Sequence, residues 1–184
     1  FDGIKNITSG EGGAILSSDL DFIQKVKDAR LLGIEKDTDK RYLGQRSWDF
    51  DVKNQGFRFH MSNIMAAIGM AQLERIDFFK TKRQKIVNKY IKELSVLIDV
   101  NFLDFNFNEI LPHIIVLKVK NRDQLREHLV KNDIECGIHY KPNHMHTKYA
   151  EKFTNPVTES ISTNILFLPC HVDLTKREQD FVIK

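Results

Sequence analysis

The longest helical pattern in the sequence, residues 61–97, limits most strongly what this chain can fold into. Ser62 or Asn63 can cap its start, and its first half is rich in small residues. Its second half is basic, with apolar residues spaced for one face of a helix. Because the stretch is too long for one ordinary globular helix, we predict a break or bend near Ile76–Phe79. A helix of this kind is expected to join two lobes.

Two further patterns precede the long helix. Residues 14–16 are a short apolar run bounded by glycines and by Ser-Ser-Asp, which predicts a strand. From Asp19, a plausible N-cap, apolar residues follow with helical spacing as far as Gly33, which is typical of a helix stop. Residues 34–56 are highly charged and lack periodicity, so we expect a long excursion of the kind that often carries function.

Beyond the long helix, the sequence predicts a small α+β lobe from about residue 98 to the end. Apolar runs that predict strands alternate there with amphipathic stretches that predict helices. The predicted strands are residues 113–119, 134–140 and 164–170, and the predicted helices are residues 121–133 and 175–184, the second capped by Thr175.

Composition excludes several classes of function. The net charge of the 184 residues is only +3 and no basic stripe stands out, so a nucleic-acid role has little electrostatic support. The two cysteines, Cys136 and Cys170, have no metal-type spacing and fit a reducing cytosol. No apolar run is long enough to span a membrane, and no signal peptide is recognisable.

Because the chain starts at Phe1 without a methionine, we expect it to be the later part of a longer protein.

Lys5 stands just ahead of a turn that contains Gly10, Gly12 and Gly13. A lysine amine forms a Schiff base with a carbonyl cofactor only when it is close and oriented, and a rigid glycine turn can hold that geometry. Taken alone, the same pattern also describes a solvated loop lysine.

Four segments decide between these alternatives, because they occur in the order and spacing of one known family. They are KNITSGEGGAILSSD (5–19), GFRFHMSNIMAAIGMAQLERID (56–77), GIHYKPNH (137–144) and LPCHVDLTKREQDFVI (168–183). The sequence resembles the DegT/DnrJ/EryC1/StrS family of sugar aminotransferases over nearly its whole length. These are enzymes that use pyridoxal 5′-phosphate (PLP) and have the α/β aspartate-aminotransferase fold, PLP fold type I.

The resemblance implies that this chain is about the C-terminal half of such an enzyme. Residues 1–78 would end the large PLP-binding domain and start the connecting helix, and residues 79–184 would form the small C-terminal α+β domain. Lys5 would bind PLP covalently and later move a proton between the substrate carbon and the cofactor. The aspartate, aromatic residue and serine that complete the cofactor site would lie upstream of Phe1.

One segment departs from the family pattern, since Arg58 and His60 stand where many members have asparagine and then arginine. The asparagine position reaches across a homodimer interface to the cofactor phosphate of the partner, and a guanidinium also pairs well with phosphate. Arg58 is therefore a candidate cofactor-binding residue, and His60 a candidate substrate-binding residue. The alternative is that both only support their loop.

The segment 137–144 contributes His139 and His144, the second of which lies near the sugar or its diphosphate in relatives. Both are candidate substrate-binding residues, and the alternative is a structural histidine satisfied by a backbone carbonyl. The loop 41–56 adds Arg41, Arg46 and Trp48 as candidate contacts to a nucleotide diphosphate, or as parts of a solvated excursion. No metal site is expected, because no carboxylate is placed to complete one.

The resemblance implies a cytoplasmic homodimer with shared active sites. It would move an amino group, expected to come from glutamate, to a keto group at C4 or C3 of a nucleotide-linked deoxysugar in cell-surface polysaccharide or glycoconjugate biosynthesis. Two other functions stay open. A PLP-binding regulatory protein would keep the lysine, whereas the related sugar dehydratases carry histidine at its position, so Lys5 disfavours them.

Overall fold

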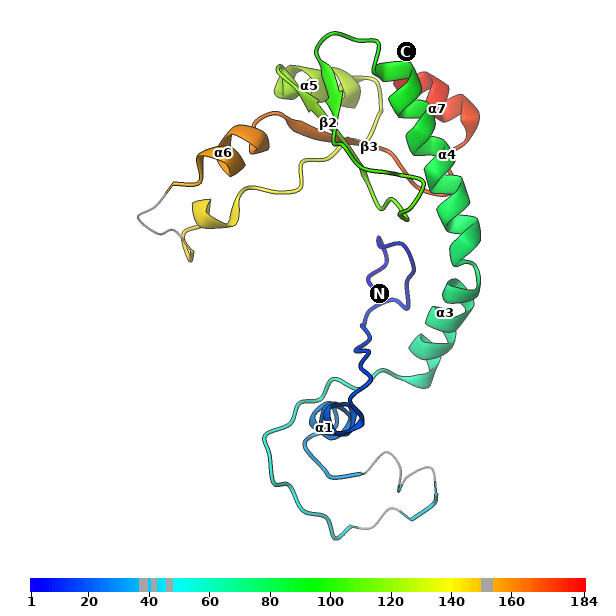
Figure 1. The fold of residues 1–184 in the computed structure, drawn as a ribbon, viewed down its shortest axis with the longest axis vertical. Helices are drawn as coiled ribbons and strands as arrows, with labels where there is room; N and C mark the ends of the chain where they lie inside the picture. The colour runs from blue at the N-terminus through cyan, green and yellow to red at the C-terminus, as the bar shows by residue number, and fades with distance from the viewer. Residues whose placement is uncertain (37–39, 41–42, 46–47, 150–153) are drawn as a thin grey trace. The chain divides into compact units, whose positions relative to one another are not determined.

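The computed structural model describes all residues except 37–39, 41–42, 46–47 and 150–153, and it divides the chain into two compact units (Figure 1). The first unit is Phe1–Glu74 and the second is Arg75–Lys184. The long helical segment is broken at this division, because α3 (Asn63–Glu74) ends before Arg75 and α4 (Ile76–Leu94) begins after it. The predicted break is confirmed, at the residue just before the predicted range.

The first unit contains α1 (Leu20–Ala29) and α3, with irregular chain around them. Asp19 caps α1 as predicted, because its carboxylate accepts a hydrogen bond of 3.0 Å from the Phe22 amide. The helix ends at Ala29, and Gly33 closes its C-terminus as predicted, because Gly33 has a φ angle of +76° and donates its amide to the Asp28 carbonyl at 2.9 Å. The carbonyls of Ala29 and Arg30 accept hydrogen bonds from Phe57 and Phe59 instead of continuing the helical ladder.

The predicted strand at Ala14–Leu16 is wrong for this structure. These residues make no strand pairing within the described part of the chain, and Leu16 is 93% exposed. A strand is stable only when a neighbour completes its hydrogen-bond ladder, and no described segment lies beside this run as such a neighbour.

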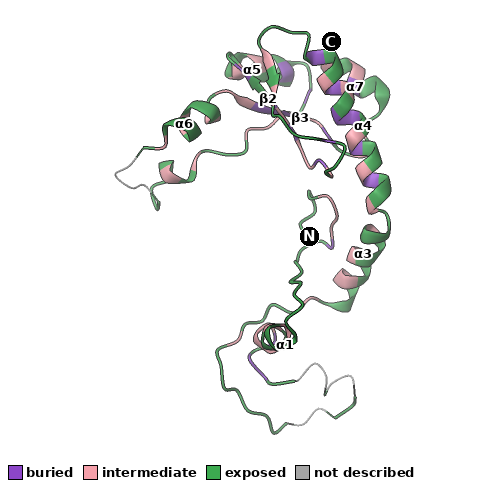
Figure 2. Ribbon diagram, in the orientation of Figure 1, coloured by how far each residue is buried: buried purple, intermediate pink, exposed green. Residues whose placement is uncertain are grey.

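Most described residues of the first unit are exposed or only partly buried (Figure 2), and many of them are apolar. Among its described residues, only Leu31 and Ile34 are buried hydrophobics. Large apolar side chains are exposed on α1, on α3 and on the segment before α1, and they include Ile15, Leu16, Leu20, Ile64, Ile68, Met70 and Leu73. Because hydrophobic burial drives folding, this unit does not form a closed core from its own described residues.

The second unit is built on an antiparallel three-stranded sheet in the order β1-β2-β3 (Figure 1). Its strands are β1 (Val100–Phe102), β2 (Ile115–Val119) and β3 (Ile165–Leu168), with Leu117 of the central strand paired to Phe102 and to Leu166. The predicted strands at 113–119 and 164–170 are confirmed. Strand β1 was not predicted from the sequence.

Four helical segments complete the second unit. They are α5 (Arg122–Lys131), the 3₁₀ turn η1 (Asn143–Met145), α6 (Pro156–Ser162) and α7 (Lys176–Ile183). The predicted Thr175 cap is confirmed as a reciprocal capping box, in which Thr175 and Glu178 each bond the other's backbone amide. Helix α6 was not predicted from the sequence.

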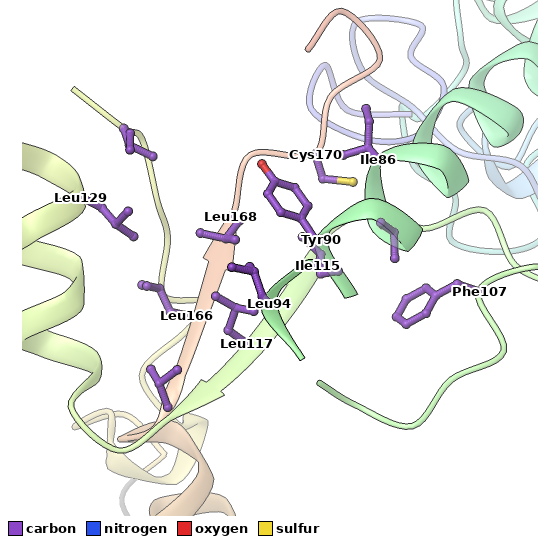
Figure 3. Packing of buried hydrophobic residues seen from close by; sticks show 13 residues of the cluster. Ile86, Tyr90, Leu94, Phe107, Ile115, Leu117, Leu129, Leu166, Leu168 and Cys170 are labelled. Carbon is purple, nitrogen blue, oxygen red and sulfur yellow. The ribbon is translucent and has the colours of Figure 1, made fainter. Parts of the chain in front are cut away.

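The core of the second unit lies between α4 and the sheet (Figure 3). Val87 and Tyr90 of α4, Ile115 of β2 and Leu166 of β3 have no exposed surface. Alternate residues of β2 are buried, which is the period-2 pattern of a strand with one covered face. Burial also raises the pKa of the Tyr90 hydroxyl, so this tyrosine stays neutral.

Two side chains fasten α4 to the rest of the second unit. The buried Arg83 guanidinium donates hydrogen bonds to the carbonyls of His113 at 2.7 Å and Cys170 at 2.6 Å. Lys89 pairs with Asp180 of α7. The Arg83 bonds hold the chain next to β2 and β3 against α4, and the Lys89–Asp180 pair holds α7 against it.

The predicted strand at 134–140 reduces to a single bridge. Gly137 exchanges both backbone hydrogen bonds with Phe167, and the neighbouring residues leave the sheet. Pro142 follows shortly after, and proline has no amide to donate to a ladder. This segment therefore passes the edge of β3 as an irregular chain.

Candidate cofactor and substrate site

The backbone around Lys5 is anchored while its side chain is exposed. The Lys5 amide donates to the Asp2 carbonyl at 3.1 Å, and the Ile4 amide donates to the Asp2 carboxylate at 3.0 Å. In the described part of the chain, the Lys5 amine has no hydrogen-bond or ion-pair partner. A fixed backbone with an accessible amine is the arrangement that a covalent cofactor lysine requires.

The glycine turn after Lys5 folds tightly, as the sequence predicts. The Ser9 amide donates to the Phe1 carbonyl at 3.0 Å, and Gly10 and Gly12 have φ angles of +85° and +123°. A Cβ on Gly12 would lie 2.4 Å from the Met61 methyl group. The positive φ angle therefore favours glycine there, whereas the Met61 methyl group, at the end of a flexible side chain, could move aside.

Helix α3 supports this turn from within the same unit. A Cβ added to Gly69 would lie 3.4 Å from the Ser9 Cβ, and Ser9 is buried. The small residue at 69 thus lets the turn approach the helix backbone. The residues present fit the cofactor predicted for this site, since the chain forms a tight, glycine-dependent turn beside an accessible amine.

Arg58 lies on a segment that pairs with the end of α1. The Phe57 amide donates to Ala29 at 2.7 Å, and the Leu32 amide donates to Phe57 at 2.9 Å, forming a bridge between Leu31 and Arg58. The rings of Phe57 and Phe59 stack at 5.1 Å on the two sides of Arg58 in sequence. Successive side chains along an extended backbone point to opposite faces, so the Arg58 side chain points away from those rings.

The Arg58 guanidinium is exposed, as is the His60 ring two residues later. Neither side chain has a hydrogen-bond or ion-pair partner among the described residues. Both groups are thus available to a ligand, but this unit does not itself join them to Lys5 by any direct bond.

The long excursion between residues 34 and 56 begins and ends at two glycines in close approach. A Cβ on Gly56 would lie 1.9 Å from the Gly33 nitrogen, and a Cβ on Gly33 would lie 2.3 Å from the Asn54 carbonyl oxygen. Trp48 within the excursion is 91% exposed. The candidate contacts Arg41 and Arg46 lie outside the described residues.

His139 lies over the edge of the sheet in the second unit. Its ring centroid is 4.6 Å from that of Tyr140 and 4.6 Å from that of Phe167. A Cβ on Gly137 would come within 3.0 Å of the His139 Nε2 atom, so glycine at 137 makes room for this ring. His139 is exposed, and aromatic contacts rather than hydrogen bonds fix it.

His144 is the one predicted site residue with a charged partner in the described chain. Its Nε2 atom lies 3.0 Å from Oε1 of Glu159, and the side chains are 13% and 33% exposed. The same carboxylate oxygen accepts a hydrogen bond of 2.9 Å from the Asn155 amide at the start of α6. The Asn155 and His144 bonds hold the pKa of Glu159 below its ordinary value.

Sequence reasoning missed Glu159. The available signal was local, since a helix that begins at Pro156 and carries an acid in its first turn often uses that acid to bond its own N-terminal amides. The pairing with His144 gives no such signal, because it joins residues fifteen positions apart through tertiary structure.

Two other classes of site find no support in the described residues. No group of three or more His, Cys, Asp or Glu side chains there could hold a metal ion. Burial raises the pKa of both thiols, Cys136 and Cys170, which makes them poor nucleophiles.

No helix in the described residues is long and apolar enough to cross a membrane.

A lysine on a tight glycine turn, followed by a small α+β unit, is the arrangement expected of the second half of a PLP enzyme of fold type I. The sequence model of the DegT/DnrJ/EryC1/StrS aminotransferase family matches residues 1–184, and the chain belongs to this family. The resemblance found in the four sequence segments is thus confirmed. PLP is the cofactor of this family.

Solved structures confirm the fold class. The sugar aminotransferase CalS13 from Micromonospora echinospora is 26% identical with a TM-score of 0.84, covering 97% of this chain and 47% of its own. The putative sugar aminotransferase Spr1654 from Streptococcus pneumoniae, in its PMP form, is 25% identical with a TM-score of 0.85, covering 100% of this chain and 50% of its own. Spr1654 has also been solved in a PLP form.

A curated relative comes from an archaeon. The uncharacterized protein MJ1066 of Methanocaldococcus jannaschii is 32% identical over 161 residues, which are 83% of this chain and 42% of the relative. The chain thus spans about half the length of the relatives it matches, whether curated or solved.

Proposed function

We propose that the full-length protein is a PLP-dependent aminotransferase. It moves an amino group from glutamate to a keto group at C4 or C3 of a nucleotide-linked deoxysugar, for cell-surface polysaccharide or glycoconjugate synthesis. Family membership supports the reaction class, and the observation that carries the proposal is the exposed Lys5 amine on its anchored turn. Residues 1–78 complete the large domain and residues 79–184 form the small one.

The bound cofactor would supply the carbonyl that accepts the amine and a ring that withdraws electrons from the substrate carbon. The other tasks fall to the chain. Lys5 holds the cofactor through Nζ and, once displaced by substrate, Nζ carries a proton to and from the reacting carbon. Arg58 provides a charge for a phosphate group, since guanidinium donors match phosphate oxygens.

The polar groups of the two candidate segments support the proposed substrate class. Arg58 and His60 in the first unit, and His139 and His144 in the second, offer cations and hydrogen-bond donors for a large anionic substrate. A site that pairs hydroxyls rejects analogues lacking them far more strongly than an apolar pocket does. We therefore propose that these groups recognise the sugar and its diphosphate.

We also propose that the working unit is a cytoplasmic homodimer with shared active sites. The small residues at the start of α3 (Ala66, Ala67 and Gly69) and the Arg58 segment resemble interface elements of the family, and this resemblance supports the proposal. Closed two-fold pairs are the commonest oligomers. An active monomer in sedimentation at micromolar concentration would exclude this assembly.

The alternatives differ in what they do with glutamate. A PLP-binding regulatory protein would bind the cofactor without turnover of glutamate. A sugar dehydratase would consume the nucleotide sugar without forming an amino sugar. The presence of lysine at position 5, rather than histidine, disfavours the dehydratase.

The proposal is tested with full-length protein, PLP, glutamate and a panel of 3-keto and 4-keto nucleotide sugars. Mass spectrometry follows the amino sugar and 2-oxoglutarate. Formation of both products in equal amounts supports the aminotransferase. Amination of simple 2-oxo acids alone, or no turnover with any sugar, contradicts it.

A further inference from the structure

Glu159 lies between the start of α6 and the ring of His144. Its Oε1 atom is 3.0 Å from His144 Nε2 and 2.9 Å from the Asn155 amide nitrogen. The 3₁₀ turn η1 carries His144, so this carboxylate ties η1 to α6. The imidazole is nearly covered at 13% exposure, and Glu159 is more open at 33%.

The contact determines which ring nitrogen carries hydrogen. Glu159 accepts from a backbone amide, and its pKa lies below the ordinary value, so at neutral pH it is an ionised carboxylate. An ionised carboxylate only accepts hydrogen bonds. The hydrogen between the two side chains therefore belongs to Nε2, whether the imidazole is neutral or protonated.

We propose that Glu159 is a positioning residue that orients His144 so that Nδ1 is the only ring nitrogen open to the nucleotide-sugar substrate. This inference rests on the proposed function. An Nδ1 atom without hydrogen accepts from a sugar hydroxyl, and a protonated one donates to a phosphate oxygen. Glu159 does not touch the substrate and acts only through the histidine.

A double-mutant cycle tests this inference in the full-length enzyme. Glu159→Gln keeps the shape of the side chain and can still accept the Asn155 amide, but it loses the charge that fixes the ring. We expect kcat/KM for the best nucleotide sugar of the panel to fall about 10- to 100-fold. In a His144→Gln background, the same change should cost less than about twofold, because the residue it acts through is absent.

Glu178→Gln is the matched control. Glu178 also accepts a backbone amide at the start of a helix, in the Thr175 capping box, but no histidine ring bonds to it. Glu178→Gln should leave kcat/KM for the sugar unchanged. Neither Glu178→Gln nor Glu159→Gln should alter the half-reaction with the amino donor glutamate. An equal fall from Glu159→Gln in both backgrounds would overturn the inference, since it would show a merely structural role.

A measurement on the wild-type enzyme decides the case if Glu159→Gln does not fold. In protein labelled with ¹⁵N-histidine, with the His144 signals assigned by loss in His144→Gln, we expect the hydrogen on Nε2. A neutral ring with its hydrogen on Nδ1 would overturn the inference. Failure of the proposed function is seen separately, as an absence of sugar amination by the wild-type enzyme.

Discussion

Gly33 and Gly56 meet backbone to backbone at the base of the long excursion, where a Cβ on Gly56 would lie 1.9 Å from the Gly33 nitrogen. No side chain fits between them. Because Arg58 follows two residues later on the same paired segment, this close approach also fixes the position of the Arg58 backbone.

Gly56→Ala should therefore force the two ends of the excursion apart. We expect the free energy of unfolding to fall by about 1–3 kcal/mol, the usual cost of overpacking. Denaturant unfolding measures this change. Gly13→Ala is the control, because a Cβ there meets no atom within 4 Å. Equal stability of the two variants would show that the close approach is not maintained in solution.

Arg58→Ala should weaken cofactor or substrate phosphate binding more than it harms folding. Loss of a charge-assisted contact should remove about 1.5–3 kcal/mol of binding free energy. Titration of the full-length protein with PLP and with the nucleotide sugar measures the loss. Arg126→Ala, an exposed arginine on α5, is the control and should change neither affinity. Unchanged affinities in Arg58→Ala would leave Arg58 a loop-supporting residue.

Arg83→Met should destabilise the second unit. The guanidinium donates to the carbonyls of His113 and Cys170, and methionine fills similar space without donating. We expect a loss of about 1.5–3 kcal/mol in unfolding free energy. The comparison is Arg126→Met on the surface of α5, which should shift stability by less than about 0.5 kcal/mol. A similar small shift in both variants would contradict the clamping role of Arg83.

Glu178 should contribute to acid stability at the start of α7. Bonds from Thr175 hold its pKa below the ordinary value of 4.5. Such a carboxylate stabilises the fold above its ordinary pKa, and that contribution is lost as the pH falls toward the lowered value. Unfolding of Glu178→Gln should therefore depend less on pH below about 5 than unfolding of the wild type. Parallel pH profiles would show that the capping box does not form.

Local patterns allowed much of this fold to be predicted from the sequence. Asp19 and Thr175 cap helices because their side chains accept from the amide three residues away, and such signals survive without tertiary context. The break before Ile76 was predictable because helix length and a change in composition are also local. Strand β2 followed from a continuous apolar run.

The failures arose where distant segments meet. Ala14–Leu16 has the composition of a strand but no ladder partner among the described residues, so composition alone was misleading. The Gly33–Gly56 approach and the His144–Glu159 pair bring together residues that no spacing rule connects. The pairing of Phe57 and Phe59 with the carbonyls at the end of α1 likewise joins segments that are distant in sequence.

The central claim is that Lys5 binds the cofactor covalently. Full-length protein loaded with PLP should be reduced with labelled borohydride, digested and mapped by mass spectrometry, with Lys5→Arg and the exposed α4 variant Lys92→Arg treated in parallel. We predict that the cofactor and label remain on the peptide containing Lys5, that Lys5→Arg retains none, and that Lys92→Arg matches the wild type. Label on any other lysine, or full labelling of Lys5→Arg, would contradict the account.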